Sequence, residues 1–136
     1  MVKRAEFVAE ARTWIGTPFL HQGRTRHGID CAGVAIKCAH RLGISTFDID
    51  GYSRVPSNGM MRRLLREHTE EIPLANIDIA DLLHMAFATE PQHIVIVSSI
   101  DPVMIIHADS VVGRVVEHRL DGDWRSKVRG AYRIPL

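Results

Sequence analysis

Apolar residues recur at helical spacing in three stretches of the N-terminal half of the chain. The first stretch predicts a helix over residues 5–15, which ends because Pro18 disfavours helical geometry in the residue before it. The second predicts a helix over residues 31–41 with Asp30 as its N-cap, and the third predicts a helix over residues 59–68. The three apolar faces consist of Phe7, Val8, Ala11, Trp14 and Ile15, then Val34, Ala35, Cys38 and Leu42, then Met61, Leu64 and Leu65.

After Pro73 the pattern changes to short apolar runs, which predict strands at residues 81–87, 93–98, 103–108, 114–118 and 128–134. Helices followed by strands are typical of an α+β fold, in which helices pack on one side of an antiparallel sheet. The stretches at 19–29 and 44–58 are rich in glycine and polar residues and are predicted as loops. No linker, repeat or low-complexity segment interrupts the 136 residues, so we expect a single domain over residues 1–136.

The composition narrows the possible functions. Hydrophobic residues make up 46% and charged residues 24% of the chain, which excludes a disordered or fibrous protein. The 17 Lys and Arg against 16 Asp and Glu give a net charge of +1, which argues against a nucleic-acid partner. No run reaches the roughly 18 apolar residues that span a membrane, and the N-terminal residues lack the apolar core of a signal peptide. We therefore expect synthesis in the cytoplasm without a secretion signal.

Cys31 is the first candidate for a catalytic residue. It follows the predicted N-cap and so lies in the first turn of a helix, where free N–H groups and the helix dipole stabilise a thiolate and can hold an oxyanion. Free cysteines are usually buried, but the polar loop before Cys31 favours a reactive role. Cys38 lies two turns further along, about 10 Å away. That distance is too long for a disulfide, and the neighbours of Cys38 on its helix face are apolar, so Cys38 is predicted to pack in the core.

Two histidines at predicted strand ends are candidates for the base that a thiol nucleophile needs. His93 begins the run HIVIV, and His107 follows the run VMII. Antiparallel strands joined by a loop of about four residues bring both rings to the same end of the sheet. One histidine can then accept the proton while the other fixes its orientation. The spacing alone leaves a purely structural role open for both.

Zinc binding is the alternative for this cysteine and these two histidines. Zinc needs three protein ligands with an open position, or a fourth ligand. The chain lacks the short paired spacings of zinc modules, such as Cys-x2-Cys, so we predict no metal and no cofactor. The other histidines are predicted to be polar surface residues: His21, His27, His40, His68, His84 and His118.

Five motifs in order along the chain resemble the NlpC/P60 cysteine peptidases. They are GTPFLHQG, then DCAG with its cysteine twelve residues after Phe19, then DLLHM, QHIVIV and IIHAD. The pattern GTPF-x-HQG and the later segment HRLDGDW are similar to the compact branch encoded in phage and prophage tail gene clusters. The resemblance extends from Ala11 to the end of the chain.

This resemblance implies a reduced papain-like fold, with the nucleophile at the start of a helix packed on an antiparallel sheet. By position, Cys31 corresponds to the nucleophile, His93 to the general base and His107 to the third, orienting residue. The implied substrate is the peptide stem of peptidoglycan, cut between D-glutamate and a diamino acid. The tail-encoded branch implies a place at the virion tail tip beside other tail-tip proteins, where the enzyme opens the cell wall during DNA delivery.

Two positions depart from the pattern of this family. Phe19 stands where many relatives have tyrosine, so it cannot donate a hydrogen bond, and the N–H of Cys31 is expected to do more, aided by Gln22. Ala32 replaces a serine that is common after the cysteine, so a substrate contact is lost.

The substrate-binding residues expected from these motifs are Phe19, His21, Gln22 and Asp30, with Asp30 in contact with a substrate amine. Two other functions remain open from the sequence. One is a different acyl-transfer enzyme on the same scaffold, such as an amidase or thioesterase. The other is a structural tail component with this fold and little activity.

Overall fold

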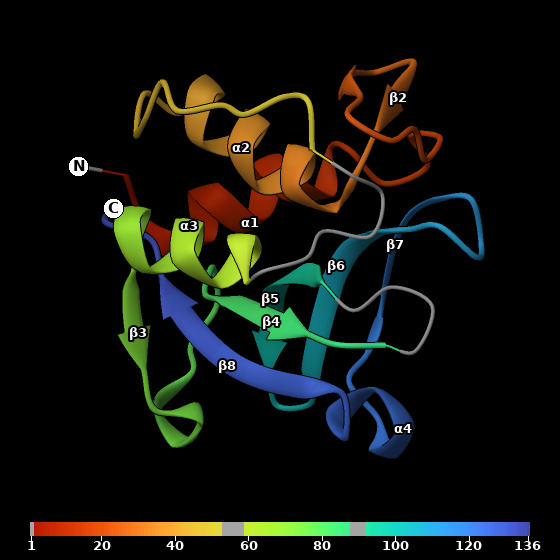
Figure 1. Cartoon of the computed structure of the whole chain (residues 1–136). Coiled ribbons are helices and arrows are strands. Elements are labelled where there is room, and N and C mark those ends of the chain that lie inside the picture. The colour runs from red at the N-terminus through yellow and green to blue at the C-terminus, as the bar shows by residue number, and fades with distance from the viewer. Residues whose placement is uncertain (1, 53–58, 88–91) are drawn as a thin grey trace.

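A six-stranded antiparallel sheet forms the centre of the molecule (Figure 1). The structure is a computed structural model that describes residues 2–52, 59–87 and 92–136. The strands are β3 Glu70–Ile72, β4 Leu82–Met85, β5 His93–Ile100, β6 Val103–Asp109, β7 Arg114–Arg119 and β8 Val128–Arg133. Their spatial order is β3-β8-β4-β5-β6-β7, so the three strands β5, β6 and β7 are neighbours in sequence and in space.

Helices pack on one face of this sheet: α1 Arg4–Arg12, α2 Cys31–Arg41 and α3 Met60–His68. Side chains alternate between the faces of a strand, so Leu82, Ile94 and Ile96 face the helices and join a buried cluster with Phe7 and Val34. In the described residues, no helix has the length and apolar character needed to cross a membrane.

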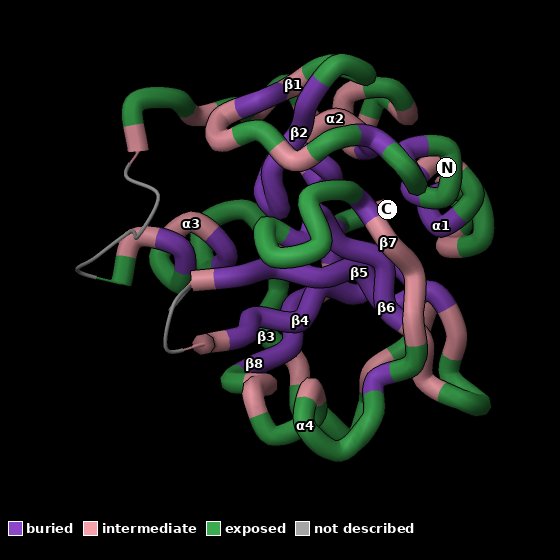
Figure 2. Tube along the Cα trace, turned by 90° about the vertical axis from the view of Figure 1, so that its right-hand side faces the viewer, coloured by how far each residue is buried: buried purple, intermediate pink, exposed green. Residues whose placement is uncertain are grey.

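The other face of the sheet carries a second apolar cluster. Alternate residues such as Leu83, Val95 and Ile105 form it, together with Trp124 of the short helix α4 Gly122–Arg125. The 3-10 helix η1 Leu74–Asn76 precedes β4 in the chain. Figure 2 shows β4, β5 and β6 buried along most of their length, whereas α4 is largely exposed. The sheet therefore separates two cores, and residues next to each other on one strand belong to different cores.

The predicted loop at 19–29 contains a small antiparallel pair, β1 Arg24–Thr25 and β2 Gly28–Ile29. Backbone hydrogen bonds hold this segment against the end of the main sheet. Phe19 N donates to Gly113 O at 2.8 Å, and Ile29 N donates to Pro18 O at 3.0 Å. Because Gly113 lies in the turn between β6 and β7, the start of α2 is held at the end of the sheet where β6 ends.

The structure confirms the α+β arrangement and the positions of the predicted helices and strands. The second helix has the predicted bounds, and Asp30 caps it through Oδ1, which accepts from Gly33 N at 2.8 Å. Cys38 is buried in the core as predicted. Each of the five predicted strands is present, with ends that differ by up to two residues.

The first helix is shorter than predicted. It ends at Arg12, because Thr13 folds back through its hydroxyl to Glu10 O at 2.6 Å and Gly16 adopts a left-handed φ of 91°. Ile15 is therefore 44% exposed and not part of the core. The strand β3, the helix α4 and the β1–β2 pair were not predicted, because such short elements have no periodic apolar pattern.

Candidate active site

Cys31 is the first residue of α2, as the capping pattern predicts. It keeps 9% of its surface exposed, whereas Cys38 is fully buried. Burial, together with the nearby Glu10 carboxylate, raises the pKa of the Cys38 thiol to about 12. Both thiols are free, and of the two only Cys31 keeps any exposure to solvent.

The carboxylate of Asp30, the residue before Cys31, is buried and accepts four hydrogen bonds from separate segments, and we call this group of contacts a junction. Its Oδ1 accepts from Gly33 N at 2.8 Å and from Arg24 Nη1 at 2.9 Å. Its Oδ2 accepts from Gln22 N at 2.9 Å and from the hydroxyl of Tyr52. Burial and the hydrogen bond to Asp30 raise the pKa of Tyr52, so this hydroxyl stays protonated and donates. Asp30 therefore joins the cap of α2 to the preceding loop and to the segment after α2.

The other expected substrate-binding residues lie around the same junction. The side chain of Gln22 donates to Tyr52 O at 2.8 Å and accepts from Gly51 N at 3.0 Å, and His21 Nε2 lies 2.9 Å from Tyr52 O. Phe19 is half-buried against the helix-side core. Contact of these residues with a substrate stays a prediction. Sequence reasoning missed Tyr52, because nothing local in a turn-rich segment indicates a bond to a carboxylate 22 residues earlier.

His93 and His107 are in contact, as their positions at the strand ends predict. Nε2 of His93 lies 2.8 Å from Nδ1 of His107, and both residues are 1% exposed. Burial is the main reason that the pKa of His107 falls to about 2, with smaller contributions from His93 and His118. His107 is therefore a neutral ring at neutral pH, in hydrogen-bond contact with His93.

The structure corrects the prediction that His118 is a polar surface residue. It is half-buried on β7, and its Nε2 lies 2.9 Å from Nε2 of His107. Trp124 packs against both rings, with centroid distances of 4.9 Å to His107 and 4.6 Å to His118. The contact between His118 and His107 follows from the hairpin register: β6 and β7 place Ile105 opposite His118, so His118 lies diagonal to His107 on the same face.

His84 also differs from its prediction as a surface residue. It lies buried on β4, with Nε2 2.9 Å from Gln92 Oε1, and burial lowers its pKa. Among the described residues, no cluster of three or more His, Cys, Asp or Glu side chains is arranged to hold a metal ion.

Cys31 and the histidine pair belong to the same end of the sheet. The helix α2 packs against β5 and β6, the strands that carry His93 and His107. Cys31 belongs to the helix-side core with Ile94 and Ala108, whereas the rings of His93 and His107, one residue earlier on each strand, lie toward the other core, against Phe87 and Trp124. In Figure 1 the first turn of α2 points to the end of the sheet where β5 begins and β6 ends. The fold thus brings the start of α2 and the histidine pair to one end of the sheet, and contact between the Cys31 thiol and His93 stays a prediction.

A cavity of about 320 Å³ opens beside the paired rings. His93 and His107 form part of its wall, and Phe87 and Trp124 supply its aromatic surface. Three charged residues also line it: Asp109, Asp123 and Lys127. A polar peptide can therefore approach the histidines from this side.

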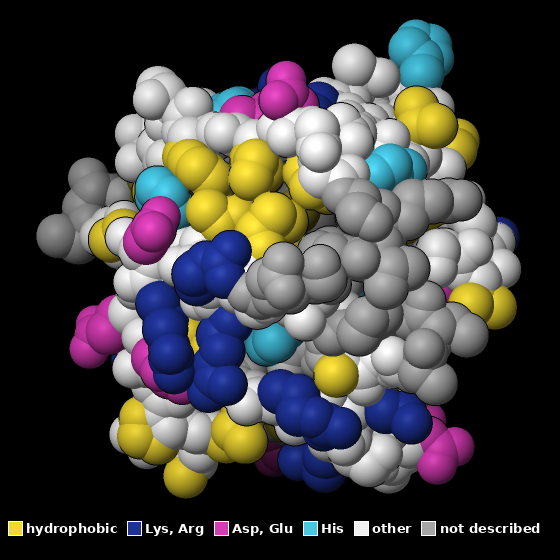
Figure 3. All heavy atoms as spheres, in the orientation of Figure 1, with side chains coloured by type: hydrophobic (Ala, Val, Ile, Leu, Met, Phe, Trp, Pro, Cys, Tyr) yellow, Lys and Arg dark blue, Asp and Glu magenta, His cyan; other side chains and the backbone are white. Residues whose placement is uncertain are grey.

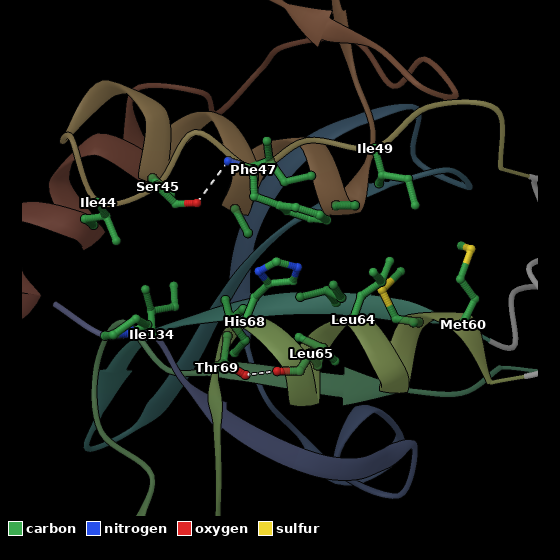
Figure 4. Close-up of a pocket in the computed structure, with 18 of the residues that line it drawn as sticks. Ile44, Ser45, Phe47, Ile49, Met60, Leu64, Leu65, His68, Thr69 and Ile134 are labelled. Atoms are coloured by element: carbon green, nitrogen blue, oxygen red, sulfur yellow. Dashed lines mark hydrogen bonds between the residues drawn. The ribbon is translucent and has the colours of Figure 1, made fainter.

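A separate cavity of about 240 Å³ lies between α2, α3 and the segment that follows α2. Figure 4 shows Phe47 and Ile49 on one side of it and Leu64 and His68 on the other, with the rings of Phe47 and His68 3.9 Å apart. Figure 3 shows apolar side chains gathered at its mouth, beside lysine and arginine side chains. Most of its lining is apolar, and none of the predicted catalytic residues lines it.

Comparison with known proteins shows the same fold in solved structures. No protein-family model matches the chain, and no curated protein sequence matches it significantly. The NlpC/p60 domain of the peptidoglycan hydrolase SagA aligns over 98% of this chain and 100% of its own length, with a TM-score of 0.69 and 23% identity. The peptidoglycan hydrolase RipB of Mycobacterium tuberculosis aligns over 98% of this chain and 66% of its own, with a TM-score of 0.66 and 17% identity.

A third structure, an NlpC/P60 family protein from Bacillus cereus, aligns over 98% of this chain with a TM-score of 0.74 and 17% identity. The aligned region is 40% of that chain, so the present chain spans less than half of its length. The fold class predicted from the motifs is confirmed, and the chain has the NlpC/P60 fold.

Proposed function

We propose that the chain is a cysteine peptidase that hydrolyses the peptide stem of peptidoglycan, at the bond between D-glutamate and a diamino acid. The observation that carries the proposal is the hydrogen-bonded pair of His93 and His107 at the sheet end where α2 begins with Cys31. Two proteins that share the fold, SagA and RipB, are named as peptidoglycan hydrolases, which supports this substrate class.

The proposed reaction is acyl transfer through a thioester. The thiol of Cys31 gives its proton to His93, and the sulfur attacks the carbonyl carbon of the peptide bond. His93 then returns the proton to the leaving amine, and a water molecule, deprotonated by His93, hydrolyses the thioester. His107 keeps the His93 ring in place through its hydrogen bond. N–H groups at the start of α2 stabilise the oxyanion. No metal or cofactor takes part in these steps.

The proposed substrate site includes Phe19, His21, Gln22 and Asp30. The carboxylate of Asp30 already accepts four hydrogen bonds, so a substrate amine has to replace one of these donors to reach it. Among the four donors, the Tyr52 hydroxyl is uncharged and belongs to a segment outside residues 22–33, so it is the donor most easily replaced. We therefore place the amine where Tyr52 meets Asp30.

The proposal includes delivery at a phage tail tip, with other tail-tip proteins as partners and the wall as the site of action. This part rests on the GTPF-x-HQG and HRLDGDW segments of the sequence. Detection of the chain by mass spectrometry in purified particles, and its crosslinking to tail-tip proteins, tests it. Absence from particles that are competent for infection contradicts it.

Digestion of defined stem peptides tests the enzymatic proposal. Purified wild-type protein and the Cys31→Ala variant are incubated with muropeptides of known sequence, and the products are identified by mass spectrometry. We expect cleavage between D-glutamate and the diamino acid by the wild type alone. Cleavage of another amide or ester bond identifies a different acyl-transfer enzyme, and intact substrate with a folded wild type favours the structural tail component.

A further inference from the structure

Three histidine rings form one hydrogen-bonded chain across β5, β6 and β7. His93 and His107 are joined at 2.8 Å, and His107 and His118 at 2.9 Å. The chain ends on the backbone of Arg119, whose carbonyl oxygen lies 2.9 Å from Nδ1 of His118. The second ring pair therefore extends the pair that the proposed mechanism uses.

The backbone end of this chain gives every hydrogen bond a direction. A carbonyl oxygen only accepts, so Nδ1–H of His118 donates to Arg119 O. A neutral imidazole carries one proton, so Nε2 of His118 accepts from Nε2–H of His107. By the same rule, Nδ1 of His107 accepts from Nε2–H of His93. The unprotonated nitrogen of His93 is then Nδ1.

The surroundings keep the middle ring neutral. His107 is buried, and its pKa of about 2 means that it holds a single proton at neutral pH. Trp124 packs against His107 and His118 at 4.9 Å and 4.6 Å between ring centroids. A neutral imidazole donates from only one of its nitrogens. If Nε2 of His107 donates to His118, Nδ1 of His107 therefore has to accept from His93.

We propose that His118 is a positioning residue that sets the tautomer of His93 through His107. The inference rests on the proposed function, because the tautomer of His93 affects catalysis only if His93 is the base. With His118 in place, Nδ1 of His93 has a lone pair that takes the proton of the Cys31 thiol. Without it, His107 can donate from Nδ1 instead, and His93 then holds its proton on Nδ1, where it cannot accept another.

Kinetics of two His118 variants test the effect on the reaction. His118→Leu removes the acceptor, whereas His118→Gln keeps an acceptor oxygen near the place of Nε2. A wrong tautomer slows catalysis without loss of binding, so we expect kcat to fall about tenfold in His118→Leu with KM unchanged, and to return to within about twofold in His118→Gln. Equal kcat values for the two variants overturn the inference. The matched control is His68→Leu, a partly exposed histidine on α3 beside the apolar cavity, which keeps wild-type kcat.

Nitrogen NMR of the imidazole rings tests the tautomer directly and independently of activity. In the wild type we expect protons on Nε2 of His93, Nε2 of His107 and Nδ1 of His118. In folded His118→Leu we expect His93 to shift wholly or partly to the Nδ1–H form. A wild-type His93 protonated on Nδ1, or a tautomer that is unchanged in His118→Leu, overturns the inference. The spectra report the tautomers whether or not the protein cleaves peptides, so a failure of the proposed function is seen separately.

Discussion

Replacement of Asp30 by alanine should destabilise the fold strongly, because this carboxylate holds four donors together. The change removes the N-cap of α2, which typically costs about 1 kcal/mol. It also leaves the guanidinium of Arg24, whose side chain is 15% exposed, without its buried partner. Removing one member of a buried ion pair typically costs about 3–5 kcal/mol. Arg24 retains Asp48 at 3.0 Å and the Ile49 carbonyl, so we expect a total loss of about 3 kcal/mol.

Urea unfolding followed by tryptophan fluorescence measures this loss in the free energy of unfolding. Asp48→Ala is the matched control, because Asp48 pairs with the same guanidinium but its side chain is 41% exposed. Exposed pairs contribute little, so we expect less than about 1 kcal/mol for the control. If Asp30→Ala and Asp48→Ala lose similar free energies, the carboxylate of Asp30 is not a junction that holds these segments together.

Three further predictions concern the cysteines and the histidine pair. Brief iodoacetamide treatment of the folded protein should alkylate Cys31 and leave Cys38 unmodified, because Cys38 is buried and its pKa is raised to about 12. Peptide mapping that finds Cys38 labelled first refutes the prediction. His93→Ala should lower kcat/KM more than His107→Ala, since the first removes the base and the second only its orientation, and the reverse order means that their roles are exchanged. The free energy of unfolding should fall as the pH drops below about 6.5, by up to about 1.4 kcal/mol per pH unit, because His107 is protonated in the unfolded chain but not in the folded protein until its pKa of about 2. Urea unfolding should show a smaller dependence of this free energy on pH in His107→Gln, and an equal dependence contradicts the lowered pKa of His107.

The sequence contains enough local information to predict the elements that carry the chemistry. Asp30 before an apolar helical run predicts both the start of α2 and the position of Cys31 at its first turn. The apolar runs that begin at His93 and end near His107 predict two strands, and the short connection between them predicts their antiparallel pairing. The contact between the two rings follows from this pairing.

The parts that were missed depend on contacts between distant segments. Tyr52 reaches Asp30 from a turn-rich segment, and the bond that selects this tyrosine forms only in the folded chain. The edge strand β3 is three residues long with two exposed glutamates, so it lacks an apolar alternation. His118 is half-buried against His107 and against Trp124, which belongs to a four-residue helix. Short elements and surface-like residues take their roles from tertiary packing, which a local pattern does not show.

Capture of the acyl-enzyme tests most directly whether Cys31 is the nucleophile of a peptidase. Wild-type protein is mixed with a stem peptide, the reaction is stopped with acid within one turnover, and the protein is digested and mapped by mass spectrometry. We expect the D-glutamyl part of the substrate attached as a thioester to Cys31, with no adduct and no cleavage in Cys31→Ala. Cleavage of the peptide by Cys31→Ala at the wild-type rate would contradict this role for Cys31.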